Sequence, residues 1–237
     1  MSAVRSLAGI SVVVPAAGIG SRLSSQIPKQ YLTLQGKTVL EVTLARLLAL
    51  RPDRLVLVVG ASDERYQQIP LVDACEVVTG GELRSDSVMS GLVALDIAAS
   101  EFVMVHDAVR PCVCAEDVNR LIDAVDFQPP GGLLASPVND TLKSADEAAQ
   151  VTQTVPSANL WRAQTPQLFP VRLLQEALIQ AGNQKLECTD DAQAIEHMGF
   201  HPKIVACADH NLKITQRSDL ALACAILSQQ ESNACSG

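Results

Sequence analysis

The sequence predicts an α/β domain built on a doubly wound, mostly parallel sheet. Short apolar runs of strand length alternate with longer segments whose apolar residues recur at helical spacing. This alternation is typical of a parallel sheet covered by helices on both faces. The chain has 237 residues, of which 48% are hydrophobic and 19% charged, and this composition suits one domain with a sizeable core. We therefore expect a single domain spanning residues 1–237.

The expected strands are short runs rich in Val, Ile and Leu. Runs of this length and composition indicate buried strands. They comprise residues 10–15, 54–60, 75–79, 102–107 and 132–138. Ligands of such sheets bind at the carboxyl ends of the strands, so the residues that follow each run are the first candidates for a site.

The expected helices lie at residues 38–50 and 86–97, where apolar residues form one stripe. The stripes consist of Val39, Leu40, Leu44, Leu47 and Leu48 in the first segment and of Val88, Leu92, Val93 and Leu95 in the second. At the end of the chain, we expect the residues after Gln229 to be a frayed tail.

Residues 140–154 have a different pattern, because two polar strand-like segments flank a turn of Asp, Glu and Ala. This pattern predicts a protruding β-hairpin arm within residues 138–158. A hairpin with little apolar surface is marginally stable alone. We therefore expect the arm to pack against a second copy of the chain, giving a homodimer.

Composition excludes several classes of protein. The net charge of -8, from 18 basic and 26 acidic residues, disfavours an extended nucleic-acid surface. The seven Cys are scattered without paired C-x-x-C spacing, so we expect reduced thiols and neither a disulfide framework nor a zinc site. No apolar run approaches the roughly 20 residues of a membrane span, and no targeting segment precedes the first strand. We expect a cytoplasmic protein without membrane contact.

The strongest functional pattern follows the first strand, in residues 15–23 and 28–31. Gly18 and Gly20 allow backbone N–H groups to approach a phosphate, while Arg22 and Lys29 supply positive charge. A Gly-x-Gly can also be a plain tight turn. Leu23 stands where a dinucleotide-binding loop would carry a third glycine, and no G-x-x-x-x-G-K-[ST] is present, which disfavours an NAD-dependent dehydrogenase and a P-loop NTPase.

This loop resembles the signature of pyrimidine nucleotidyltransferases, and in particular that of the 2-C-methyl-D-erythritol 4-phosphate cytidylyltransferase family. Further blocks resemble that family in the same order along nearly the whole chain. They are Gly80-Gly81-Glu82-Leu83-Arg84-Ser85-Asp86-Ser87-Val88, His106-Asp107-Ala108-Val109-Arg110-Pro111, Asp140-Thr141-Leu142-Lys143, Leu160-Trp161-Arg162-Ala163-Gln164-Thr165-Pro166-Gln167, Thr189-Asp190-Asp191 and Asn211-Leu212-Lys213-Ile214-Thr215.

The resemblance implies a Rossmann-like fold of the nucleotide-diphospho-sugar transferase type. It also implies transfer of CMP from CTP to 2-C-methyl-D-erythritol 4-phosphate, giving 4-diphosphocytidyl-2-C-methyl-D-erythritol and pyrophosphate in non-mevalonate isoprenoid precursor biosynthesis. The acceptor phosphate would attack the α-phosphorus in line, with Mg²⁺ as cofactor, so that catalysis would be mainly positioning and electrostatics.

The resemblance also assigns residues to roles. The catalytic residues would be Arg22, Lys29 and Lys213. The nucleotide would be bound by Ala16, Ala17, Gly18, Gly20, Gly81, Glu82, Ser87, Asp107 and Ala108. The acceptor would be bound by Arg110, Asp140, Thr141, Lys143, Thr165 and Thr189. Asp107, at the end of a predicted strand, is also the candidate Mg²⁺ ligand, because Mg²⁺ needs only one or two carboxylates beside phosphate oxygens.

Several of these positions have a structural interpretation as well. Ser87 also suits the first turn of a helix. Lys213, in a strand-like segment, would lie on the opposite face from its neighbours and could be an edge-strand lysine. His106 is interpreted as structural, because an attacking phosphate needs no proton removed at neutral pH.

The sequence departs from the family at Ser157, where an Arg usually helps to hold the acceptor phosphate. Ser cannot make a bidentate charged contact, so we expect a weakened acceptor site, for which the nearby Arg162 could compensate. His210 stands where an acidic residue is common, and Gln216 where Arg is frequent. Ribitol 5-phosphate cytidylyltransferase and a catalytically inactive nucleotide-binding regulator remain as alternatives.

Overall fold

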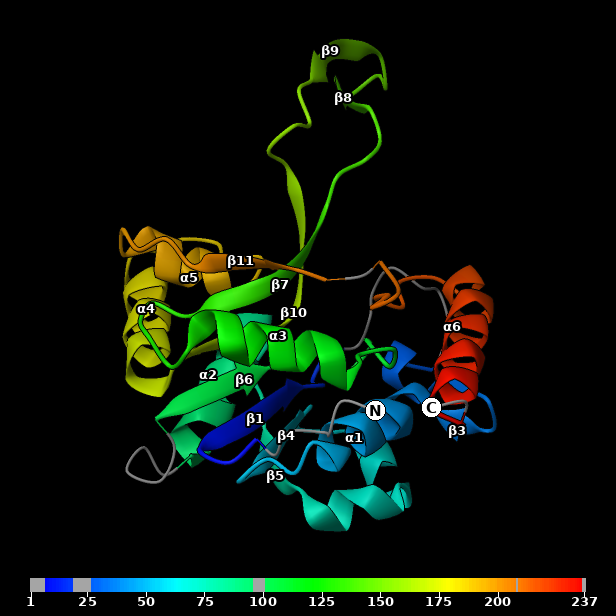
Figure 1. The fold of residues 1–237 in the computed structure, drawn as a ribbon. Coiled ribbons are helices and arrows are strands. Elements are labelled where there is room, and N and C mark those ends of the chain that lie inside the picture. Colours follow the sequence, from blue (N-terminus) through cyan, green and yellow to red (C-terminus); the bar gives the residue numbers. More distant parts are fainter. Residues whose placement is uncertain (1–6, 19–26, 96–100, 208, 236–237) are drawn as a thin grey trace.

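The computed structural model describes residues 7–18, 27–95, 101–207 and 209–235, which form a layered α/β body with a slender arm (Figure 1). The central sheet has seven strands in the order β11-β7-β10-β6-β1-β4-β5. Neighbouring strands are parallel except for β10, which is antiparallel to both β6 and β7. The predicted doubly wound, mostly parallel sheet is confirmed.

The strands of this sheet agree closely with the apolar runs of the sequence. They are β1 Ile10–Pro15, β4 Leu55–Val59, β5 Glu76–Thr79, β6 Phe102–Val105, β7 Gly132–Pro137, β10 Trp161–Pro170 and β11 Lys203–Ala206. Every predicted strand is present, with ends that differ by at most two residues. Strands β10 and β11 were not predicted. Polar residues and Pro166 interrupt β10, and its pairing with β7 shifts register between Ala163 and Gln167.

Helices cover both faces of the sheet. They are α1 Val39–Ala49, α2 Arg84–Ala94, α3 Ala115–Val125, α4 Val171–Asn183, α5 Asp191–His197 and α6 Ser218–Cys235. The apolar sides of α1 and α3 share a cluster with Val12 and Val14 of β1, whereas those of α2, α4 and α5 pack around Val13. Because successive strand residues point to opposite faces, β1 is buried on both sides. Helices α1 and α2 were predicted; residues 96–97 of the second segment lie outside the described residues.

Short elements complete the body beside α1. They are the 3₁₀ turns η1 Lys29–Tyr31, η2 Arg65–Gln68 and η3 Pro70–Ala74, and the paired strands β2 Thr33–Leu34 and β3 Lys37–Thr38. Helix α6 packs its buried Leu227 into a third cluster with Leu34. The expectation of a frayed tail after Gln229 is wrong, because α6 continues to Cys235 and the Gln230 amide donates a hydrogen bond to the Cys112 carbonyl at 3.0 Å.

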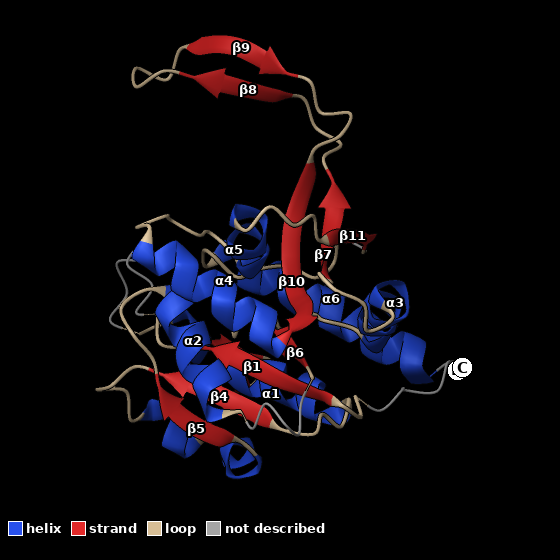
Figure 2. Cartoon of the chain, turned by 90° about the vertical axis from the view of Figure 1, so that its left-hand side faces the viewer, coloured by secondary structure: helices blue, strands red, loops and turns tan. Residues whose placement is uncertain are grey.

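The predicted arm is a two-stranded antiparallel hairpin of β8 Leu142–Ala145 and β9 Val151–Val155. It extends from β7 and β10, well away from the helices (Figure 2). Asp146 stabilises the turn, since its Oδ1 accepts hydrogen bonds from the backbone N–H groups of Ala148 and Gln150. Among the described residues, no helix is both long and apolar enough to cross a membrane.

Close packing of α2 on the sheet predicts the effect of a small substitution. A Cβ added at Gly91 would lie 2.5 Å from Val13 Cγ1, in the middle of β1. We expect Gly91→Ala to lower the free energy of unfolding by about 1–3 kcal/mol, because overpacking a buried contact forces the backbone apart. Gly182→Ala in α4 is the control: a Cβ there meets no atom within 4 Å, and Ala favours the helix by up to about 1 kcal/mol. Urea unfolding of both variants checks this, and equal stabilities would contradict it.

Candidate functional site

A cavity of about 250 Å³ lies at the carboxyl ends of β1 and β6. It is lined by, among others, Gly18, Lys29, Arg84, Asp107, Ala108 and Lys213. We call it the phosphate cavity. It brings together the predicted phosphate loop, the residues that follow β6, and the segment before α6, which are distant in sequence. The sheet edge at which ligands were expected is therefore the edge at which these charges meet.

Buried hydrogen bonds hold the described part of the phosphate loop. Ala16 donates from its backbone N–H to the Val58 carbonyl at 2.7 Å, which continues the pairing beyond β1. The buried Gln30 amide donates to the carbonyls of Ala16 at 2.9 Å and Gly18 at 3.3 Å. A Cβ added at Gly18 would meet no atom of the described residues within 4 Å. The loop and its neighbour Lys29 line the phosphate cavity, a volume that a ligand can enter. Gly20 and Arg22 lie outside the described residues.

Asp107 is the centre of the charge arrangement, with its side chain only 9% exposed. Its Oδ1 lies 3.1 Å from Arg84 Nε, and its Oδ2 lies 2.8 Å from Lys213 Nζ and 3.6 Å from Arg110 Nε. Burial alone would raise the pKa of this carboxyl, but Arg84, Lys213 and Arg110 hold it well below its usual range. Asp107 is therefore ionised at neutral pH.

Arg84 links two buried carboxylates. Its guanidinium donates to both oxygens of Asp191, at 3.0 and 2.9 Å, as well as to Asp107. Although burial would lower its pKa, Asp191 and Asp107 raise the pKa of Arg84, so it remains a cation. The bidentate pair fixes the start of α2 relative to the start of α5, and it orients Asp107 towards the phosphate cavity.

His106 is fully buried, and both of its ring nitrogens have partners. Nε2 lies 3.0 Å from the Arg110 carbonyl, which can only accept, so Nε2 carries the proton. Nδ1 therefore accepts from the Thr165 hydroxyl at 3.2 Å, and that hydroxyl in turn accepts from the Asp107 N–H at 3.0 Å. Burial lowers the pKa of His106 to about 4. The histidine is neutral and structural, and Thr165 fixes the backbone of Asp107.

Arg110 and Lys213 belong to one linked network. Arg110 is buried and donates to the Asn211 carbonyl at 2.8 Å, while the Asn211 amide donates to the Thr165 carbonyl at 2.6 Å. Lys213 lies in an extended loop and not in the expected strand. Among the described residues of this segment, Ile214 makes a backbone hydrogen bond of the kind that joins strands, from its N–H to the Val109 carbonyl, and one such bond does not make a strand. The loop places the Lys213 ammonium, 43% exposed, at the mouth of the phosphate cavity.

The Gly80-Gly81 block has a clear packing role. A Cβ at Gly80 would lie 2.5 Å from Ser87 Oγ and 2.9 Å from Ala17 Cβ, and one at Gly81 would lie 2.4 Å from Asp86 Cβ. These glycines allow α2 to approach the phosphate loop. Ser87 is buried in the first turn of α2, where its hydroxyl donates to the Leu83 carbonyl at 3.2 Å. This position agrees with its interpretation as a structural residue of the helix start. Glu82 is exposed beside the block.

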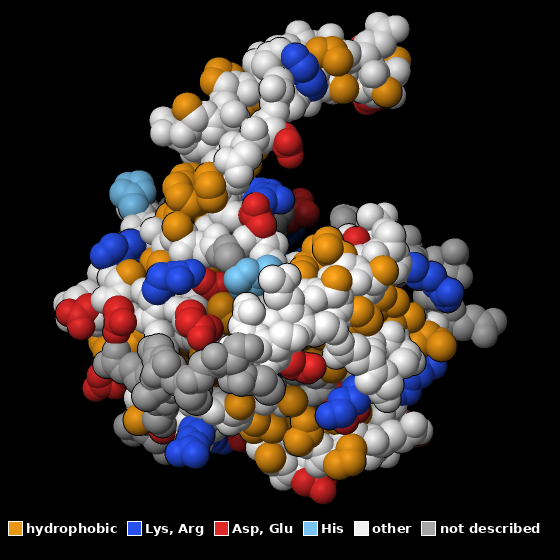
Figure 3. Space-filling view, turned by 45° about the vertical axis from the view of Figure 1, so that its right-hand side comes forward, with side chains coloured by type: hydrophobic (Ala, Val, Ile, Leu, Met, Phe, Trp, Pro, Cys, Tyr) orange, Lys and Arg blue, Asp and Glu red, His pale blue; other side chains and the backbone are white. Residues whose placement is uncertain are grey.

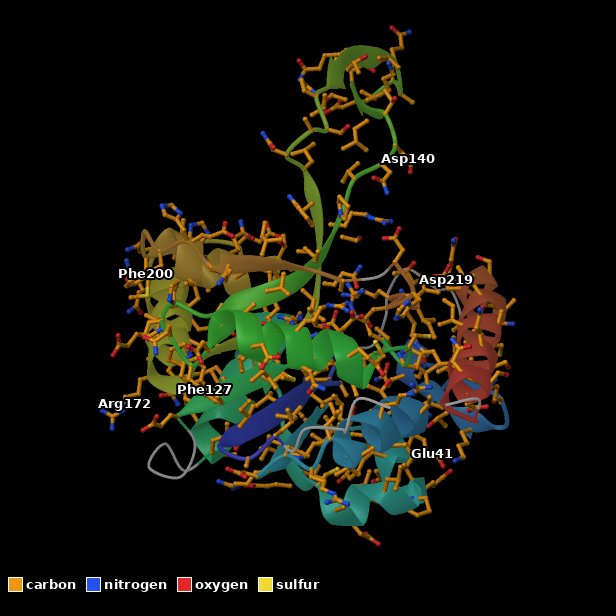
Figure 4. The ribbon with its side chains drawn as sticks, in the orientation of Figure 1. Glu41, Phe127, Asp140, Arg172, Phe200 and Asp219 are labelled. Carbon is orange, nitrogen blue, oxygen red and sulfur yellow. The ribbon has the colours of Figure 1, made fainter. Side chains whose placement is uncertain are left out.

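None of the six expected acceptor residues lines the phosphate cavity in the described structure. Arg110 and Thr165 are buried in the network around Asp107, and the other four lie elsewhere. Asp140, Thr141 and Lys143 belong to the arm, where Asp140 lies far above the sheet (Figure 4) and Lys143 donates to Thr154 Oγ1 at 2.6 Å. Thr189 is exposed before α5 and donates to the Gln193 side chain. The arm residues therefore lie away from the phosphate cavity of their own chain.

A second cavity, of about 630 Å³, lies at the base of the arm and is lined by residues that include Asp140, Trp161, Arg162 and Asp209. Arg162 pairs there with Asp209 at 2.5 Å, and both side chains are well exposed. Ser157 lies in the turn below β9, where its carbonyl accepts from Leu160 N–H. Arg162 is therefore the guanidinium of this region that could replace the missing family arginine.

The structure adds four polar residues to the predicted site: Gln30, Arg84, Asp191 and Asn211. All four lie in sequence blocks that carry the family resemblance, but none was assigned a role. Each is at least partly buried and bonded to another part of the site. Their signal in the sequence was position within a block, since nothing in local spacing shows that Arg84 meets Asp191, 107 residues away.

A loop that exposes backbone beside Lys29, with a second lysine and an ionised carboxylate at the same sheet edge, defines a nucleotidyltransferase. The family model described as 2-C-methyl-D-erythritol 4-phosphate cytidylyltransferase matches residues 10–229. The chain belongs to this family and is a cytidylyltransferase.

Individual relatives carry the name of the same family. The enzyme of that name from Klebsiella pneumoniae is 45% identical over 91% of this chain and 92% of its own length, and that from Cronobacter sakazakii is 44% identical over 92% and 93%. The crystal structure of the Francisella tularensis enzyme superposes with a TM-score of 0.78 at 34% identity, covering 92% of this chain and 99% of the other.

Proposed function

We propose that the chain transfers CMP from CTP to 2-C-methyl-D-erythritol 4-phosphate, releasing pyrophosphate, in isoprenoid precursor biosynthesis. Family membership supports the reaction, and the observation that carries it is the meeting of Lys29 and Lys213 at one cavity around the ionised Asp107. The ribitol 5-phosphate and inactive-regulator alternatives are not favoured, because the relatives carry the methylerythritol name and because Lys29 and Lys213 both line the phosphate cavity.

Each residue has a defined task in this proposal. The backbone of Ala16, Ala17 and Gly18 lines the triphosphate, and Lys29, with Arg22 from the same loop, stabilises the charge that builds on the α-phosphate. Lys213 holds the attacking acceptor phosphate in line, and the 2.8 Å contact with Asp107 orients its ammonium group. Arg110 acts through Asp107 and Asn211, because its own donors are directed to the protein.

Asp107 is the residue that suits Mg²⁺ best, although its oxygens already face three cations. This arrangement fits an ion held mainly by the phosphate oxygens of CTP, with Asp107 in contact through water. When bound, Mg²⁺ would neutralise charge on the triphosphate. The residues of the chain bind and orient the two phosphate groups. We place this activity in the cytoplasm, where CTP is available.

The test is pyrophosphate release from CTP and Mg²⁺ with each acceptor in separate reactions. We expect release with 2-C-methyl-D-erythritol 4-phosphate, none with ribitol 5-phosphate, and a rate reduced at least about 100-fold in Lys29→Ala. Lys37→Ala, which removes an exposed lysine of β3, is the control. Release with ribitol 5-phosphate alone would move the assignment to that enzyme, and release with neither acceptor would refute cytidylyl transfer to either.

We further propose that the arm, residues 138–158, joins two copies of this single domain and brings Asp140, Thr141 and Lys143 to the partner's acceptor site. The arm exposes apolar side chains that no described residue covers, as Figure 3 shows for its tip, with Val151 64% exposed. We expect Val151→Asp to shift the sedimentation of the dimer towards the monomer. Ile204→Asp, on the exposed face of β11, is the control, and a dimer that survives Val151→Asp would contradict an interface at this position.

Ser157 gives a prediction about acceptor affinity. Ser157→Arg restores a guanidinium at the position that usually carries one, near the base of the arm. We expect KM for the acceptor to fall severalfold while KM for CTP is unchanged, because a bidentate charged contact to phosphate is added. Steady-state kinetics with each substrate varied in turn check this. An unchanged or raised acceptor KM would show that Arg162 already fills the role.

A further inference from the structure

We propose that Cys114, Asp117 and His210 form a Zn²⁺ site at the start of α3, separate from the phosphate cavity. One ligand atom from each side chain lies within 4.8 Å of the other two. Cys114 Sγ is 3.5 Å from His210 Nε2, and His210 Nε2 is 3.7 Å from Asp117 Oδ2. None of these residues lines the phosphate cavity.

The two separations that involve His210 match those of a tetrahedral site. With Zn–S near 2.3 Å and Zn–N and Zn–O near 2.0–2.2 Å, tetrahedral ligands lie about 3.6 Å apart for S and N and about 3.4 Å apart for N and O. The observed 3.5 and 3.7 Å are close to these values. An ion can therefore be held with only small side-chain rotations.

Asp117 contributes a buried carboxylate to this cluster. Its side chain is 2% exposed, and Oδ2 accepts no hydrogen bond from any described residue, whereas Oδ1 pairs with Arg120. A buried carboxylate oxygen without a donor is costly. Oδ2 faces His210 Nε2 and lies beside Cys114, so a cation between the three would satisfy it.

The ligand types select the metal. A thiolate and an imidazole suit Zn²⁺ and disfavour Mg²⁺, which prefers oxygen ligands throughout. Burial, aided by the neighbouring Asp117 carboxylate, raises the pKa of the Cys114 thiol to about 12, so binding must displace its proton. His210 is 35% exposed, which leaves a fourth position for water on the solvent side.

A metal bound at this site would restrain the loop that carries Lys213. His210 directly precedes Asn211, whose carbonyl holds Arg110 and whose amide bonds to Thr165. A metal shared by α3 and His210 would fix the beginning of that loop to the helix. The ion would stabilise the loop and take no part in the transfer itself.

The test is titration of metal-free, reduced protein with Co²⁺ under anaerobic conditions in excess Mg²⁺. We expect one equivalent to bind with the near-ultraviolet charge-transfer band of a cobalt thiolate and the intense visible bands of tetrahedral Co²⁺, and stoichiometric Zn²⁺ to abolish both. Zn²⁺ at about a hundredfold excess over Kd should also raise the thermal midpoint by roughly 5–10 °C.

Variants identify the ligands. Cys114→Ser should abolish the charge-transfer band, and His210→Gln and Asp117→Asn should weaken Co²⁺ binding at least about 100-fold, since loss of an outer-sphere partner alone costs up to that much. His210 is partly exposed, so its variant tests the site even if the Asp117 variant misfolds. Cys75→Ser and His201→Gln, a half-buried thiol and an exposed imidazole elsewhere, should bind like the parent. A parent without the band, or a band that persists in Cys114→Ser, would overturn the proposal.

Discussion

Replacing Lys213 with Ala is expected to lower kcat for cytidylyl transfer about 10²–10³-fold, with a smaller effect on KM for CTP. The Lys213 side chain lines the phosphate cavity, as Lys29 does, and is 43% exposed, so it is positioned to meet an incoming acceptor phosphate. Loss of Lys213 removes a positive charge that offsets the repulsion between the acceptor phosphate and the triphosphate as they approach each other. Stability should change little, because Asp107 keeps Arg84 and Arg110 as partners.

Steady-state kinetics with CTP and acceptor varied separately measure this effect. Lys37→Ala is again the matched control. Lys213→Arg keeps the positive charge but changes its reach, so it should recover part of the lost rate. A Lys213→Ala enzyme that retains a tenth or more of the parental kcat would show that another group orients the acceptor phosphate.

The sequence predicts the body of this fold well, because its strands are continuous apolar runs. Val12, Val13 and Val14 are buried on both sides of β1, as expected for a central strand of a sheet covered on both faces. Strand β10 could not be predicted in this way. Its pairing depends on neighbours in space, and its polar Gln164 and Thr165 are buried because Ser136 and His106 bond to them.

The residues of the site also fall into two groups, those that the strand order could place and those that depend on contacts between distant segments. The loop after β1 and Asp107 after β6 could be placed from the order of the strands, since parallel strands end at one edge. Lys213 was expected on a strand, but bonds made by Asn211 and Ile214 to remote residues hold it in a loop. The Cys114 and His210 pair is 96 residues apart, so no spacing in the sequence could reveal a cluster there.

Arg84 gives the largest expected effect on stability. Arg84→Leu leaves Asp191 and Asp107, 1% and 9% exposed, without their main cation. Removing one partner of a buried ion pair typically costs about 3–5 kcal/mol, so we expect a loss of that size in the free energy of unfolding at pH 7.5. Arg172→Leu, on the exposed side of α4 (Figure 4), should change it by less than about 0.5 kcal/mol.

The pH dependence distinguishes loss of charge pairing from loss of packing. In the parent, the pKa of Asp107 lies below its unfolded value of about 4, so its stabilisation is complete above that pH and is lost as the pH falls below it. Burial already holds the pKa of Asp191 above its usual value in the parent, against the effect of Arg84. In Arg84→Leu the pKa of Asp191 rises further, and that of Asp107 rises although Lys213 and Arg110 remain beside it. Protonation then relieves the penalty as the pH falls towards 5, so the difference between parent and variant should shrink. Urea unfolding at pH 7.5 and pH 5 measures it, and a difference independent of pH would mean that Arg84 contributes packing and not charge.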